Sequence, residues 1–186
     1  MKLDVQDSSF TKQLGHISNA ADNCAKIIAK VLTTEELLDT PLELRSLGSI
    51  LKDCTEEASV KYSDTKIGYD IAISSSLVLA DDFLESLFDS LIENAIKHNT
   101  FTEKCVWISL SNREDGYEAR IADNGEGIPD EKKKWLFDIQ RRHGGMGLHQ
   151  SKQIVSKYGG RIEVYDRVPM DHHLGSEFRI WFPRKR

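Results

Sequence analysis

The sequence has no run of apolar residues that approaches the length of about 20 residues needed to cross a bilayer as a helix. Its N-terminus also lacks the charged segment followed by an apolar one that marks a secretory signal. Internal repeats and low-complexity segments are absent as well. We therefore expect a chain that carries no membrane segment.

Cysteine is scarce, and the three cysteines have neither the spacing of a disulfide framework nor that of a metal site: Cys24, Cys54 and Cys105. Each lies in a segment with apolar periodicity, so we expect reduced core cysteines in a cytoplasmic protein. Positive charge is in deficit, because 25 Lys and Arg face 30 Asp and Glu, for a net charge of -5. This balance argues against a dedicated nucleic-acid surface, and we expect no nucleic-acid partner.

The N-terminal part of the chain is predicted to be a helix with a heptad-like apolar stripe over most of residues 12–38. The stripe comprises Leu14, Ile17, Ala21, Cys24, Ile28, Val31 and Leu38. A stripe this regular needs a partner, which is either another helix of this chain or a second copy in a homodimer. A helix that lies on the core of its own domain would give the same pattern.

A break at Thr40-Pro41 ends this helix, because the residue before a proline disfavours helical geometry. A second, shorter helix is predicted from Leu44 to near residue 62. We therefore predict an N-terminal helical segment at residues 1–62 and a separate domain at residues 63–186.

This second domain contains separate strand and helix signals. Period-two alternation of apolar residues predicts strands at 67–73, 106–110, 117–121, 161–165 and 176–182. Helical spacing predicts helices at 83–96, 132–137 and 148–158. The stretch at 166–175, with Asp171-His172-His173, is predicted to be a polar loop, since no third metal ligand has suitable spacing. Because strands and helices are segregated, we predict an α+β fold, a two-layer α/β sandwich of one sheet and one helical layer.

The helix at 83–96 follows an acidic pair, Asp81-Asp82, of which one residue is predicted to cap its first turn. Three polar residues fall together on one edge of this helix, off the apolar stripe: Asn94, Lys97 and His98. An amide, a cation and an imidazole on one edge suit a metal-bound polyphosphate. A solvated polar face of an ordinary amphipathic helix is the alternative.

Two glycine-containing stretches follow. Asp123-x-Gly125-x-Gly127 comes directly after a strand, where glycines permit a close backbone approach and a carboxylate can accept a hydrogen bond from an exocyclic amine. The second stretch, at 144–148, runs into a helix, whose free N–H groups suit phosphates. Taken alone, each is also an ordinary turn or loop.

Three motifs occur in the order ENAIKH, DNGEGIP and GGMGL, and the last of them opens a helix that ends in YGGRIEV. Together they resemble the motifs of the Bergerat-type (GHKL) ATPase family. Within it, residues 64–183 look most like the catalytic ATP-binding domain of a sensor histidine kinase. The resemblance implies ATP and Mg²⁺ as ligands, bound through the following residues: Asn94, Lys97, His98, Asp123, Gly125, Gly127, Ile128, Gly144, Gly145, Gly147 and Leu148. It implies no catalytic side chain.

The same resemblance assigns roles. Asn94 would be the magnesium ligand, and Lys97 with His98 would face the phosphates or the sugar. Asp123 would hold the adenine amine. The remaining assignments concern loops: Gly125 and Gly127 would shape the adenine end, Gly145 and Gly147 would wrap the phosphates, and residues 128–143, with the Trp135-Leu136-Phe137 box, would form a lid.

Three departures from the family pattern limit the activity that we expect. Ser90 stands where the kinases have Asn and the hydrolysing relatives have a carboxylate base, so vigorous ATP hydrolysis is disfavoured. His143 replaces the first glycine of the last motif. His16 is followed by Ile-Ser-Asn with no carboxylate, so it is not expected to be a phosphoacceptor. The N-terminal segment instead resembles the second helix of a dimerisation hairpin.

We therefore expect a kinase module that phosphorylates a histidine on a segment not evident in this chain, with a response-regulator protein as the next recipient. One alternative is a serine protein kinase of the anti-sigma type, although such chains usually lack the N-terminal helix. The other is a catalytically silent nucleotide-binding or dimerisation module.

Overall fold

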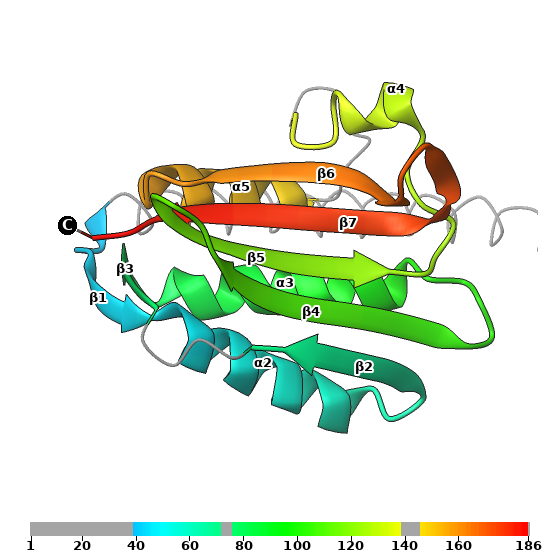
Figure 1. Cartoon of the computed structure of the whole chain (residues 1–186), viewed down its shortest axis with the longest axis horizontal. Coiled ribbons are helices and arrows are strands. Elements are labelled where there is room, and N and C mark those ends of the chain that lie inside the picture. The colour runs from blue at the N-terminus through cyan, green and yellow to red at the C-terminus, as the bar shows by residue number, and fades with distance from the viewer. Residues whose placement is uncertain (1–38, 72–75, 139–145, 186) are drawn as a thin grey trace, which may run out of the picture. The chain divides into compact units, whose positions relative to one another are not determined.

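The computed structural model describes residues 39–71, 76–138 and 146–185 (Figure 1). The chain divides into two compact units, Met1–Thr40 and Pro41–Arg186. The predicted heptad stripe and His16 lie outside the described residues, as do His143, Gly144 and Gly145.

The second unit is built on a five-stranded sheet with the order β2-β4-β5-β7-β6, in which β2 and β4 are parallel and the other pairs are antiparallel. The strands are β2 (Thr65–Asp70), β4 (Lys104–Asn112), β5 (Gly116–Asp123), β6 (Arg161–Val168) and β7 (Asp171–Pro183). Helices α2 (Leu47–Lys61), α3 (Phe83–Lys97) and α5 (Met146–Lys157) lie together on one face of this sheet (Figure 1). The two-layer α+β sandwich is therefore confirmed.

The core lies between this sheet and α3, the central helix of the layer. The apolar positions of α3 repeat with helical spacing, and seven of them are buried: Leu84, Leu87, Phe88, Leu91, Ile92, Ala95 and Ile96. Phe88 packs edge to face on Phe182 of β7, with ring centroids 6.3 Å apart. The polar edge of α3 is consequently fixed relative to the sheet.

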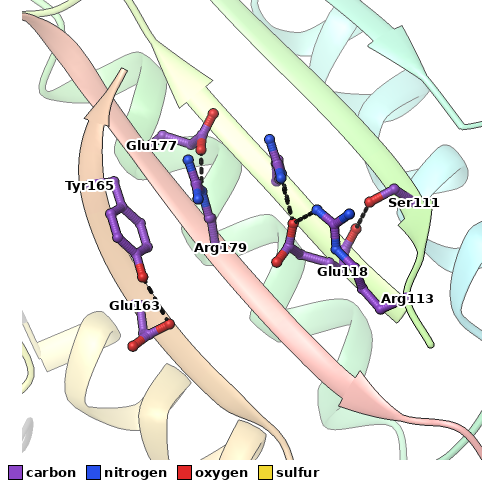
Figure 2. Close-up of polar contacts among 8 residues, drawn as sticks. Ser111, Arg113, Glu118, Glu163, Tyr165, Glu177 and Arg179 are labelled. Atoms are coloured by element: carbon purple, nitrogen blue, oxygen red, sulfur yellow. Dashed lines mark hydrogen bonds and ion pairs between the residues drawn. The ribbon is translucent and has the colours of Figure 1, made fainter. Parts of the chain in front are cut away.

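The opposite face of the sheet is polar, and its charges are paired within the chain (Figure 2). Arg120 and Arg179 stand directly opposite each other on β5 and β7, where like charges destabilise a sheet. Glu118 accepts hydrogen bonds from Arg120, at 2.8 Å, and from Arg113, while Glu177 accepts one from Arg179. The strands alternate between apolar and charged residues because helices cover only one face of the sheet, and the pairing offsets the like charges on the other face.

The start of the second unit differs from the sequence-based prediction. Leu44 lies in a short strand, β1 (Glu43–Ser46), which pairs with β3 (Leu77–Ala80), and α2 begins only at Leu47. The Ser46 hydroxyl accepts from the Ser49 N–H at 3.3 Å and caps α2. Because the buried face of α2 packs on α3, residues 41–62 belong to the same compact unit as the sheet. The sequence-based prediction placed the start of this unit after residue 62 instead.

The long hairpin between β6 and β7 is a correction to the predicted loop at 166–175. Strand β7 already begins at Asp171, and Met170 makes the turn with a positive φ of 68°. The Asp171-His172-His173 stretch is therefore extended backbone, whose register with β6 continues to the turn through the Val168–Asp171 pair. The polar composition hid this strand, because its apolar alternation begins only later. The helix predicted at 132–137 also begins earlier and is shorter, since α4 spans only Asp130–Lys133.

A buried carboxylate joins the start of α3 to the end of α5. Asp81 is 1% exposed, and its Oδ1 accepts from the Phe83 N–H at 3.0 Å, as expected for a residue that caps α3. The same carboxylate binds the Lys157 ammonium at 2.5 Å and the Tyr158 hydroxyl. Burial, together with the hydrogen bond to Asp81, raises the pKa of Tyr158. Asp82, its exposed neighbour, has no capping bond from its side chain.

Asp81→Asn is expected to lower the free energy of unfolding by about 3–5 kcal/mol, because it takes the negative charge away from a largely buried ion pair. Urea denaturation measures this change. Asp82→Asn is the matched control: its 2.5 Å pair with Arg45 is made by a carboxylate that is 83% exposed, so we expect a loss below about 1 kcal/mol. Equal losses in the two variants would contradict the structural role of Asp81.

Candidate functional site

A cavity of about 280 Å³ opens between the C-terminal half of α3, the loop after β5, the start of α5 and the middle of β7. Its wall consists of Asn94, Ala95, His98, Asp123, Glu126, Gly127, Ile128, Pro129, Lys132, Leu136, Leu148, Ser176 and Phe178. Apolar side chains with a few polar groups are typical of a small-molecule site, and the size is near the lower end of the usual range. Six of the residues predicted from the sequence are on this wall.

Asn94 and His98 come from the last turns of α3. Their spacing of four residues puts both on one edge, and the backbone N–H of His98 donates to the Asn94 carbonyl oxygen at 3.1 Å. Since the neighbouring Ala95 is buried against the core, this edge is directed to the cavity by the packing of the helix. An amide oxygen is a suitable ligand for a hard cation such as Mg²⁺.

Asp123 ends β5 and forms the polar floor of the cavity. It is 6% exposed, and its Oδ1 accepts from the Gly125 N–H at 2.7 Å. Its Oδ2 accepts from the Ser176 hydroxyl at 2.6 Å, while the Ser176 N–H approaches Oδ1 at 3.4 Å. An ionised carboxylate has about four acceptor sites, so one further donor, such as an exocyclic amine, can still be bound. Ser176 was not predicted from the sequence, although it directly follows the glycine that precedes the last apolar alternation.

The loop after β5 is held close to β7 by glycines. Gly127 has a φ of +67°, and a Cβ there would lie 1.6 Å from the His172 carbonyl oxygen. Gly175 has a φ of +104°, and its Cβ would lie 1.9 Å from the Asp123 carbonyl oxygen. Gly125 does not line the cavity, but its N–H fixes the Asp123 carboxylate. These contacts hold the loop after β5 and the start of β7 closer together than any larger residue would permit.

Two asparagines that hold this loop were also missed: Asn124, in the loop itself, and Asn99, just after α3. Asn124 accepts at Oδ1 from the Cys105 N–H and from the Asn99 side-chain amide, each at 2.7 Å. It also donates to the Glu103 carbonyl oxygen at 2.9 Å. Asn124 thus ties the end of β5 to the end of α3 and the start of β4. An Asx residue in a turn was the only sequence signal for this role.

The start of α5 forms another wall. Leu148 is buried and lines the cavity, and Gly147 precedes it in the first turn of the helix. A Cβ at Gly147 would lie 2.8 Å from the Ser90 hydroxyl oxygen, which places Ser90 beneath this turn, on the same edge of α3 as Asn94. The first N–H groups of a helix are unpaired within it and favour anions.

Lys97, like Gly125 and Gly147, is a predicted site residue that does not line the cavity. Its ammonium binds Glu93 at 2.5 Å, and it is not on the wall. Two charged wall residues were missed: Lys132, which supplies a cation from α4, and Glu126, which accepts from the Thr100 hydroxyl at 2.6 Å. Their positions depend on the path of the loop after β5, which residue spacing does not reveal.

Residues 80–186 match the family described as histidine kinase-, DNA gyrase B- and HSP90-like ATPases. The chain belongs to this family. Within the ATPase family, the sensor histidine kinase AruS of Pseudomonas aeruginosa is 30% identical over 92% of this chain, and the match covers 19% of AruS. The adaptive-response sensory kinase SasA of Crocosphaera subtropica is 25% identical over 85% of this chain and 44% of SasA. The chain thus spans about a fifth of AruS and under half of SasA.

Solved structures of this ATPase family share the fold. A mycobacterial sensor histidine kinase, MprB, superposes with a TM-score of 0.68 and 24% identity, over 77% of this chain and 98% of that one. The histidine kinase ThkA, solved in complex with the response regulator TrrA, gives a TM-score of 0.71 and 16% identity over 100% of this chain and 53% of that one.

Within residues 39–71, 76–138 and 146–185, no helix has the length and apolarity to cross a membrane. The same residues contain no group of three His, Cys, Asp or Glu side chains arranged to hold a metal.

Gly127→Ala is expected to lower the free energy of unfolding by more than about 2 kcal/mol, because a methyl group would meet the His172 carbonyl and force a left-handed φ on alanine. Thermal or urea unfolding measures the change. Gly68→Ala is the control, since the nearest atom to its Cβ would be 3.8 Å away, and we expect a change within about 1 kcal/mol. A Gly127 variant as stable as the Gly68 variant would contradict the described loop.

Proposed function

We propose that the cavity binds ATP with Mg²⁺ and that the chain is the catalytic module of a two-component sensor histidine kinase. The observation that carries this proposal is that Asn94 and Asp123 both line one cavity, together with Leu148 from the first turn of α5. A carboxylate acceptor, an amide oxygen and helix N–H groups are the partners that an adenine amine, a metal and phosphates require.

Different side chains contact different parts of the nucleotide. Asp123 accepts the adenine amine, and Ile128, Leu148 and Phe178 offer apolar surface to the base. His98 and Lys132 offer positive or hydrogen-bonding groups to the sugar and phosphates. Mg²⁺ would be held by Asn94 and the phosphates, and would offset negative charge during transfer. Few protein ligands suffice for such an ion, which agrees with the absence of a carboxylate cluster among the described residues.

The reaction that fits these groups is transfer to a protein rather than to water. A histidine nitrogen would attack the γ-phosphorus in line as the bond to the β–γ bridging oxygen breaks, and ADP would leave. Ser90 stands where a water-activating carboxylate would be needed, and a hydroxyl is a poor general base. We infer that the acceptor histidine belongs to a helical hairpin segment that is not evident in this chain. Names of relatives such as AruS and SasA, which are sensory kinases, support this assignment.

The partners follow from the same proposal. The complex of ThkA with TrrA shows that one neighbour in fold binds a response regulator, and we propose a response regulator as the next phosphate recipient here. Pairing of the N-terminal helix with a second copy would give a homodimer. Because ATP and response regulators occur in the cytoplasm, that location is part of the proposal.

Asn94→Ala and Asp123→Asn are expected to affect nucleotide binding in different ways. Asn94→Ala should weaken magnesium-dependent ATP binding about tenfold or more but leave adenosine binding unchanged, since it removes a metal ligand. Asp123→Asn should weaken ATP and adenosine alike, because both carry the amine. Titration calorimetry with ATP, with and without Mg²⁺, and with adenosine distinguishes these outcomes. Asn112→Ala, at the exposed end of β4, serves as control. If ATP affinity is unchanged in both site variants, the assignment of the nucleotide site is contradicted.

Phosphotransfer is tested with γ-labelled ATP and Mg²⁺, followed by acid and base treatment. We expect no label on the chain itself but acid-labile, base-stable label on an added histidine-bearing hairpin from AruS. Label of this kind on the chain would instead make His16 or another histidine an acceptor. Acid-stable, base-labile label on an added protein would favour the serine-kinase alternative. Intact ATP binding without transfer to any acceptor would favour the silent module.

A further inference from the structure

Glu93 lies on α3 next to the cavity residue Asn94, but it binds three side chains outside the cavity. Its Oε1 accepts from the Lys61 ammonium at 2.6 Å and from the Tyr62 hydroxyl at 2.9 Å. Its Oε2 accepts from the Lys97 ammonium at 2.5 Å. Lys61 is the last residue of α2 and Tyr62 is its C-cap. One carboxylate thus joins the end of α2 to the last residue of α3.

Lys97 lies close enough to the cavity for its positive charge to attract an anion bound there. The next residue, His98, lines the cavity, whereas the Lys97 side chain bends back by one helical turn to Glu93. Lys97 is 57% exposed, and lysine carries its charge on a flexible four-carbon stem. Its ammonium can therefore change direction without any movement of the α3 backbone.

We propose that Glu93 is a latch that holds the Lys97 ammonium away from the nucleotide phosphates, and that α2 anchors this latch through Lys61 and Tyr62. The inference rests on the proposed function, because it requires phosphates in the cavity. When the end of α2 moves, the Glu93 carboxylate moves with it, and Lys97 turns to the phosphates. The position of α2, which follows β1 at the start of the second unit, thereby sets the affinity for ATP.

Protonation does not open this latch under physiological conditions. Hydrogen bonds from Lys61 and then Lys97 lower the pKa of Glu93 to about 2, so the carboxylate stays ionised near neutral pH. The competition for Lys97 is consequently between two anions, the Glu93 carboxylate and the bound phosphates. Because both lysines are largely exposed, water screens the latch, and it tunes the affinity for ATP rather than abolishing binding.

A double-mutant cycle tests the latch. Glu93→Gln is expected to bind Mg–ATP about two- to fivefold more tightly than the wild type, the range that an exposed ion pair supports. Adenosine affinity should not change, because adenosine has no phosphate. Lys97→Met should weaken ATP binding in the Glu93→Gln background more than in the wild-type background, since only the released ammonium reaches the phosphates. Tyr62→Phe, which removes one anchor of the latch, should give a smaller gain in the same direction.

Glu56 offers a matched control on α2. It pairs with Lys52 four residues earlier at 3.6 Å and accepts from the Tyr69 hydroxyl at 3.4 Å, but it does not line the cavity. Glu56→Gln should leave ATP and adenosine affinities unchanged. The latch is overturned if Glu93→Gln binds ATP more weakly or no differently, or if its gain persists without Lys97. Failure of the wild-type chain to bind Mg–ATP would overturn the proposed function and the latch together.

Discussion

Burial of the apolar stripe of α3 against the sheet is the constraint on which the rest of the structure depends. Leu84, Leu87, Phe88 and Leu91 are fully buried, and burial of each such side chain stabilises the fold by about 1.5–3 kcal/mol. This stripe fixes the rotation of the helix about its own axis. Asn94 and His98 face the cavity because burial of the stripe fixes which edge of α3 points there. The same interaction therefore stabilises the core and orients the site.

The opposite end of the cavity is held by backbone rather than by side-chain packing. Glycines let the loop after β5 and the start of β7 approach each other more closely than any Cβ would permit, and the Asp123 carboxylate bridges them through Gly125 and Ser176. Asp123 therefore has two tasks. It organises the loop through hydrogen bonds within the chain, and it keeps acceptor capacity for a ligand. A preorganised acceptor of this kind loses little conformational freedom when a ligand binds.

The sequence predicted the layers and most of the strands and helices, because apolar periodicity directly records which faces are buried. It also predicted Asn94, His98, Asp123, Gly127, Ile128 and Leu148, all of which line the cavity. It could not predict where Lys97 points, since helical spacing places Lys97 near both Asn94 and Glu93, and the choice depends on Lys61 and Tyr62 from a distant helix. Ser176 and Lys132 were missed for a related reason, because their positions follow from strand register and loop path. The strand at Asp171 was hidden by its polar composition.

A crystal structure of the chain grown with Mg²⁺ and a non-hydrolysable ATP analogue tests the central claim most directly. The account predicts the adenine amine at the Asp123 carboxylate, a metal ion at the Asn94 amide oxygen and phosphates at the first turn of α5. Nucleotide bound on the outer face of the sheet, or bound in the cavity with its adenine away from Asp123, would contradict the account.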